Sequence, residues 1–99
     1  MLNITKTIEN ETGTLGLEGR LDTVSAPELE QVLRETLPGL RELTLDFSKL
    51  DYISSAGLRV LLSTQKTINK QGSMKLTHVN ETIMEIFDVT GFTDILTIL

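Results

Sequence analysis

The chain has 99 residues, 39% of them hydrophobic and 23% charged, which is enough for one hydrophobic core but not for two. Its net charge of -5 disfavours a nucleic-acid partner, because affinity for phosphate backbones rests on clustered Lys and Arg. No apolar run approaches the roughly 20 residues that a membrane-spanning helix needs, and no secretion signal follows Met1. With no cysteine and only His78, disulfides and multi-histidine metal sites are excluded. We expect one soluble, cytoplasmic domain over residues 1–99, without metal or cofactor.

The first half of the chain predicts a hairpin followed by a helix. Apolar and polar residues alternate over 2–8 and again over 15–21, which is typical of two strands, with a turn at about 11–13. The stretch "SAPELEQVLRETLPG" then has helical spacing of its apolar residues. We expect Ser25 to cap this helix and Glu28 to complete a capping box, while the closing Pro-Gly pair ends it.

The second half alternates strands and helices. "RELTLDFS" and "MKLTH" predict two strands, and a helix over about 55–70, closed by Gly72, lies between them. Asn80 is expected to cap a third helix that ends at Gly91, and "DILTIL" fits a strand or a helical turn equally well. The order β-β-α-β-α-β-α plus a short terminal element predicts an α/β fold, a mixed β-sheet with helices packed against it.

Two adjacent serines in "LDYISSAGLRVLL" stand where the second helix should begin. Ser54 or Ser55 would serve as an N-cap, which contributes about 1 kcal/mol. Gly57, inside the first turns, costs roughly 0.5 to 1 kcal/mol relative to alanine, so close approach of another surface is needed to explain it. That surface is either a partner protein or the protein's own sheet, and spacing alone does not distinguish them.

The side of this helix opposite its leucines is small and mostly uncharged. Helical spacing places four residues there, with Arg59 and Lys66 along one edge: Ala56, Val60, Ser63 and Thr67. Interface cores are depleted of charged residues, which makes this side a candidate docking surface. A helix N-terminus also accommodates a phosphate, because its free N–H groups and dipole favour negative charge. A phosphorylated serine here would therefore place its charge at the edge of the docking surface.

These segments together resemble the STAS domain family, and in particular its single-domain anti-anti-sigma factors. "LEGRLDTVSAPELEQVL" is similar to the family's passage from second strand to first helix, "LDYISSAGLRVLL" to its phosphorylation loop and following helix, and "VTGF" to its usual ending. The resemblance implies that Ser55 is the phosphate acceptor. Ser54 stands where many members have aspartate and is a competing acceptor. Asp22 matches an aspartate near the acceptor loop, although turn formation explains it equally well.

The function implied by the resemblance is that of an anti-sigma factor antagonist in a partner-switching system. The dephosphorylated protein would bind an anti-sigma factor that is also an ATP-dependent serine kinase, phosphorylation would end binding, and a metal-dependent serine phosphatase would restore it. We expect a monomer when free, with no nucleic acid or membrane span. The predicted partner-binding residues are Asp22, Ser54, Ser55, Ala56, Gly57, Arg59, Val60 and Ser63.

Two other functions compete with this one, of which we do not expect an enzyme. A serine hydrolase would need a base and an oxyanion hole, but "YISSAGL" is not G-x-S-x-G and only one histidine is present. A STAS subunit of a transport, lipid-handling or signalling complex that binds its partner without phosphorylation is the closer alternative. A serine kept at the acceptor position favours the switch, although serine is also a good cap.

Overall fold

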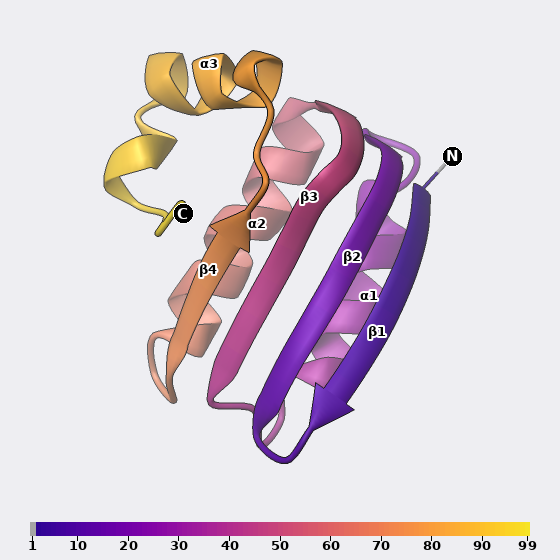
Figure 1. The fold of residues 1–99 in the computed structure, drawn as a ribbon, viewed down its shortest axis with the longest axis vertical. Coiled ribbons are helices and arrows are strands. Elements are labelled where there is room, and N and C mark those ends of the chain that lie inside the picture. The colour runs from indigo at the N-terminus through magenta and orange to yellow at the C-terminus, as the bar shows by residue number, and fades with distance from the viewer. Residues whose placement is uncertain (1) are drawn as a thin grey trace.

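A four-stranded sheet with three helices makes up the computed structural model, which describes residues 2–99 (Figure 1). The strands lie side by side in chain order: β1 (Leu2–Glu9), β2 (Thr12–Leu21), β3 (Glu42–Ile53) and β4 (Ser73–Thr77). The helices are α1 (Ala26–Thr36), α2 (Ser55–Ile68) and α3 (Glu81–Thr90), followed by the short 3-10 helix η1 (Phe92–Asp94). The predicted element order and mixed sheet are therefore confirmed.

The sheet combines one antiparallel and two parallel pairings. β1 and β2 form the predicted hairpin, whose turn includes Asn10 in a left-handed conformation (φ 58°). β2 pairs with β3, and β3 with β4, in parallel, so α1 and α2 are the crossovers between them. Both helices cover the same face of the sheet, behind the strands in Figure 1.

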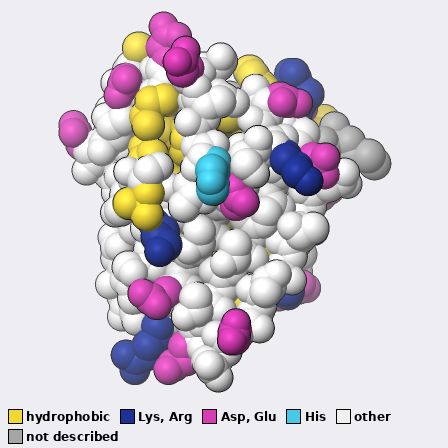
Figure 2. All heavy atoms as spheres, viewed as in Figure 1, with side chains coloured by type: hydrophobic (Ala, Val, Ile, Leu, Met, Phe, Trp, Pro, Cys, Tyr) yellow, Lys and Arg dark blue, Asp and Glu magenta, His cyan; other side chains and the backbone are white. Residues whose placement is uncertain are grey.

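The core lies between that face and the two helices. Alternate residues of β2 and β3, such as Leu15 and Leu45, are fully buried together with Leu29 of α1 and Leu61 of α2. The opposite face is largely polar in the view of Figure 2, where the side chain of His78, the one histidine, is seen beside an acidic side chain. This acidic partner is Asp46, whose Oδ1 lies 3.2 Å from His78 Nδ1.

α3 covers the part of β3 that β4 does not reach. β4 pairs with β3 only as far as Asp46, and beyond it Phe47 packs near Phe87 of α3, with ring centroids 6.3 Å apart. Asn80 caps α3 by accepting a hydrogen bond from the N–H of Ile83, and its amide donates to the Leu50 carbonyl of β3 at 3.0 Å. The predicted cap is confirmed, and the same side chain ties the start of α3 to β3.

The chain end contains both alternatives left open by the sequence. Gly91 ends α3 with a φ of 80°, as predicted, and leads into η1. Ile98 then forms an isolated parallel bridge with Leu76 of β4. Among residues 2–99, no helix combines the length and apolar character required to cross a bilayer.

α2 approaches the sheet most closely at Gly57. A Cβ on this buried glycine would lie 2.7 Å from Leu21 Cγ and 2.8 Å from Ile53 Cγ1, closer than real Cβ contacts allow. The surface that requires glycine here is therefore the protein's own sheet. Of the two explanations left open by the sequence, a partner is not needed, because Gly57 lies on the side of α2 that is buried against Leu21 and Ile53.

This packing predicts that Gly57→Ala destabilises the domain. Helix propensity alone would favour alanine by about 0.5 to 1 kcal/mol, whereas overpacking against Leu21 and Ile53 costs about 1 to 3 kcal/mol. We expect a net loss in the free energy of unfolding, measured by urea titration. A stabilised variant would show that the sheet tolerates the methyl group and that the close approach does not explain the glycine.

Candidate functional site

The carboxyl ends of β2 and β3 meet at one edge of the sheet because the two strands are parallel. Their last paired residues are Leu21 and Ile53, and the Ser54 N–H donates to the Leu21 carbonyl at 2.9 Å. The β2–α1 turn and the start of α2 are therefore neighbours, near the upper end of the sheet in Figure 1. This edge brings together Asp22 and the two serines, as their predicted roles require.

The two serines have different environments. Ser54 is the N-cap residue of α2 and is half-buried, and its Oγ is buried with no hydrogen-bond partner among the described residues. Ser55 is the first residue of the helix and is exposed. In residues 2–99, Ser54 makes no side-chain cap hydrogen bond at the start of α2. The side chain that a modifying enzyme can reach is that of Ser55.

A hydrogen-bonded turn from Asp22 to Ser25 connects β2 to α1. Asp22 Oδ1 accepts from the N–H groups of Val24 and Ser25, at 3.1 and 3.0 Å, and from the Ser25 hydroxyl. The Ser25 hydroxyl also donates to the Arg20 carbonyl at 2.7 Å. The expected capping box is wrong: Ser25 makes no side-chain cap bond, because its hydroxyl is used within the turn.

The carboxylate of Asp22 is stabilised by the same turn. Hydrogen bonding from Ser25 N–H, helped by the Ser25 hydroxyl and Val24 N–H, lowers the pKa of Asp22 below its ordinary value of 3.8 and outweighs the opposing effect of burial. Arg20 adds a long ion pair at 3.9 Å and stacks over the Tyr52 ring, 4.4 Å from its centroid. Sequence analysis missed Arg20, because the register that pairs it with Tyr52 is set between two strands distant in sequence.

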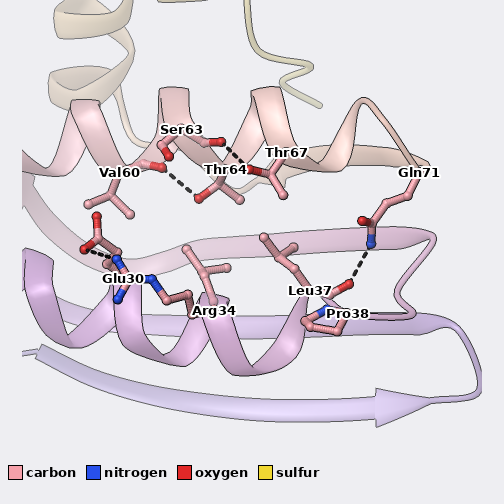
Figure 3. A pocket seen from close by; sticks show the side chains of 10 residues that line it. Glu30, Arg34, Leu37, Pro38, Val60, Ser63, Thr64, Thr67 and Gln71 are labelled. Carbon is pink, nitrogen blue, oxygen red and sulfur yellow. Dashed lines mark hydrogen bonds and ion pairs between the residues drawn. The ribbon is translucent and has the colours of Figure 1, made fainter.

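The outward side of α2 differs from the prediction at Val60. Val60 is only 7% exposed and lies in the groove between α1 and α2, as Figure 3 shows, so it adds little surface to the predicted docking side. Helical periodicity identified one buried side of α2, but the helix packs on both the sheet and α1. The groove has a volume of about 280 Å³ and is lined by Glu30, Leu33, Arg34, Leu37, Pro38, Val60, Ser63, Thr64, Thr67 and Gln71.

A second, shallower hollow of about 500 Å³ lies between the beginnings of α1 and α2. Half-buried Ala56 and exposed Arg59 and Ser63 border it, together with Thr23 of the turn. Ala56, Arg59 and Ser63 therefore remain accessible beside Ser55, as predicted for a binding surface. Among the described residues, no group of three or more His, Cys, Asp or Glu side chains could hold a metal ion.

The matching family model is described as "Mlab, STAS domain" and covers residues 4–98. The chain belongs to the STAS domain family. Two curated relatives are each 38% identical to this STAS domain. One is the putative anti-sigma factor antagonist BtrV of Bordetella bronchiseptica, over 80% of this chain and 70% of the relative. The other is the anti-sigma-B factor antagonist of Bacillus subtilis, for which the match covers 85% of this chain and 78% of the relative.

Solved structures give the same fold at lower sequence identity. An anti-sigma factor antagonist from Mycobacterium paratuberculosis superposes on the STAS domain with a TM-score of 0.90 at 19% identity, over 99% of this chain and 85% of that one. SpoIIAA in its unphosphorylated form gives a TM-score of 0.77 at 16% identity, and the match covers 100% of this chain and 87% of that one. At these identities the comparison shows the fold alone.

The lowered pKa of Asp22 predicts an acid-sensitive contribution to stability. Because the folded pKa is below the unfolded one, the carboxylate stabilises the fold fully above the unfolded pKa of about 4 and loses this effect as pH falls through the folded value. Asp22→Asn keeps an acceptor oxygen but not the charge. We expect it to be less stable than wild type at pH 7 and the difference to shrink below about pH 4 in urea titrations.

Asp51→Asn is the matched control, since Asp51 is exposed and makes no side-chain hydrogen bond within residues 2–99. Its difference from wild type should change much less over the same range of pH. A gap between wild type and Asp22→Asn that stays constant down to pH 2 would contradict a role for the charged carboxylate in the turn.

Proposed function

We propose that the protein is an anti-sigma factor antagonist in a partner-switching system. In the unphosphorylated form it binds an anti-sigma factor that is also an ATP-dependent serine kinase, and the kinase's target is released. The kinase then phosphorylates Ser55, which ends the complex, and a metal-dependent serine phosphatase restores the binding form. The relatives named as anti-sigma factor antagonists, which match most of this chain, support the regulatory role.

The exposure of Ser55 at the first position of α2 is the observation that carries the proposal. Its neighbour Ser54 has a buried hydroxyl oxygen, which argues against it as the acceptor. The chain matches SpoIIAA solved in unphosphorylated and phosphorylated forms, with TM-scores of 0.77 and 0.75. Both states of that protein thus share the fold seen here.

Phosphate at this position is compatible with the free protein but not with a docked one. The first turn of α2 contains no acidic residue, and a phosphate there interacts with the positive end of the helix dipole, a favourable contribution of about 0.3 to 1 kcal/mol. The modification adds about 1.5 to 2 negative charges. Burying that charge against a partner surface without a counter-ion is costly, which gives phosphorylation its effect on binding.

The binding surface that we propose surrounds Ser55. Gly57 is buried against the sheet, and Val60 contributes only the small surface with which it borders the hollow. The other predicted residues lie at the sheet edge or along the neighbouring side of α2: Asp22, Ser54, Ser55, Ala56, Arg59 and Ser63. Asp22 acts there by holding the turn, and the half-buried Ser54 by supporting the start of the helix. Ala56, Arg59 and Ser63 provide accessible contact area.

Phosphopeptide mapping after incubation with the cognate kinase and ATP tests the acceptor. Wild type and Ser54→Ala should be labelled on Ser55, and Ser55→Ala should not be labelled and should hold the kinase. Since Ser55 is exposed and Ser54, not Ser55, holds the N-cap position, we expect Ser55→Ala to change the free energy of unfolding by no more than about 0.5 kcal/mol.

If Ser55→Ala is labelled and Ser54→Ala is not, the acceptor is Ser54 and not Ser55. If no variant is labelled although the kinase binds wild type, the phosphorylation switch is refuted. The alternative would then hold: a STAS subunit that binds its partner without phosphorylation.

A further inference from the structure

Val24, at the tip of the β2–α1 turn, is 83% exposed and is the most exposed large hydrophobic residue among those described. An isolated exposed apolar side chain needs no explanation by itself. Val24 differs because it stands in the short segment between Asp22 and α1, where polar residues are the usual choice. Two features favour a role for Val24 in binding: the rigid turn that holds it and its position beside the proposed binding surface.

The turn presents Val24 in one fixed conformation. The Val24 N–H donates to Asp22 Oδ1, and the Asp22 N–H donates to the Ser25 hydroxyl at 2.9 Å. Ser25 itself is 3% exposed and anchored to the Arg20 carbonyl. A side chain on such a preorganised backbone loses little conformational entropy on binding, so more of its contact energy contributes to affinity.

The same turn is continuous with the surface proposed to bind the kinase. Leu21, which directly precedes it, accepts a hydrogen bond from Ser54 N–H, and Thr23 borders the hollow that Ala56 and Arg59 also line. A partner that covers Ser55 and this hollow therefore also contacts the turn, as part of one continuous interface. Interface centres commonly combine a rigid apolar anchor with surrounding polar contacts.

We propose that Val24 is an apolar anchor of the partner interface and inserts into an apolar recess on the serine-kinase partner. The proposal rests on the proposed function and adds to it a contact that is independent of the phosphorylated residue. It also assigns Asp22 and Ser25 a role in binding, because they hold the turn that presents the anchor.

Isothermal titration of the unphosphorylated protein with the cognate kinase, in the absence of ATP, tests the anchor. Val24→Ser should weaken binding at least about tenfold. Val89→Ser is the matched control, since Val89 on α3 is similarly exposed, at 79%, and should change affinity less than about twofold. Val24→Thr, which keeps the shape and adds a hydroxyl, should lie between wild type and Val24→Ser.

Unfolding midpoints of the variants, measured in parallel, should match wild type because both valines are exposed. Equal affinities of Val24→Ser and Val89→Ser, with wild type binding the kinase, would overturn the anchor and leave the proposed function intact. Failure of wild type to bind any serine-kinase anti-sigma factor would overturn both. If only Val24→Ser loses affinity for the kinase, and Ser55 is still labelled at saturating kinase, the result would support Val24 as a residue that contributes to binding and not to phosphorylation.

Discussion

The parallel pairing of β2 with β3 is the constraint on which the site depends. It continues to Leu21 and Ile53, where both strands end, and the Ser54 N–H bonds the Leu21 carbonyl. The next residues of each strand must then lie together, which brings the Asp22 turn beside the start of α2. Gly57 allows α2 to lie directly on Leu21 and Ile53, so the position of Ser55 relative to the turn is fixed by packing.

This arrangement gives the two serines different environments. Ser54 occupies the N-cap position with its hydroxyl oxygen buried, whereas Ser55 faces outward at the end of the helix where backbone N–H groups are free. The histidine that a hydrolase would require pairs with Asp46 on the open face of the sheet. The exposure of Ser55 supports the proposal that it receives a phosphate from a partner kinase.

Much of the fold was predictable because local signals agree with the tertiary structure. Asn80 and Gly91 mark the ends of α3 correctly, since an N-cap and a left-handed C-cap depend on neighbouring backbone alone. Features set by contacts distant in sequence were not predictable. Val60, for example, faces α1 across a groove that periodicity within α2 cannot reveal. Ser25 differed from its prediction for a local reason, because its hydroxyl bonds to Arg20 and Asp22 in the preceding turn rather than to its own helix. For Gly57, the sequence left open whether a partner or the protein's own sheet approaches closely, and only the positions of Leu21 and Ile53 in the fold favour the sheet.

The central claim is that charge on Ser55, rather than any change of fold, ends binding. The most direct test places phosphoserine at position 55 during synthesis, without the kinase, and compares its affinity for the anti-sigma factor with that of the unmodified protein. The account predicts affinity at least about tenfold weaker, a loss of about 1.4 kcal/mol, with an unfolding midpoint close to wild type. Equal affinity of the two forms, or loss of binding only through unfolding of the phosphorylated domain, would contradict it.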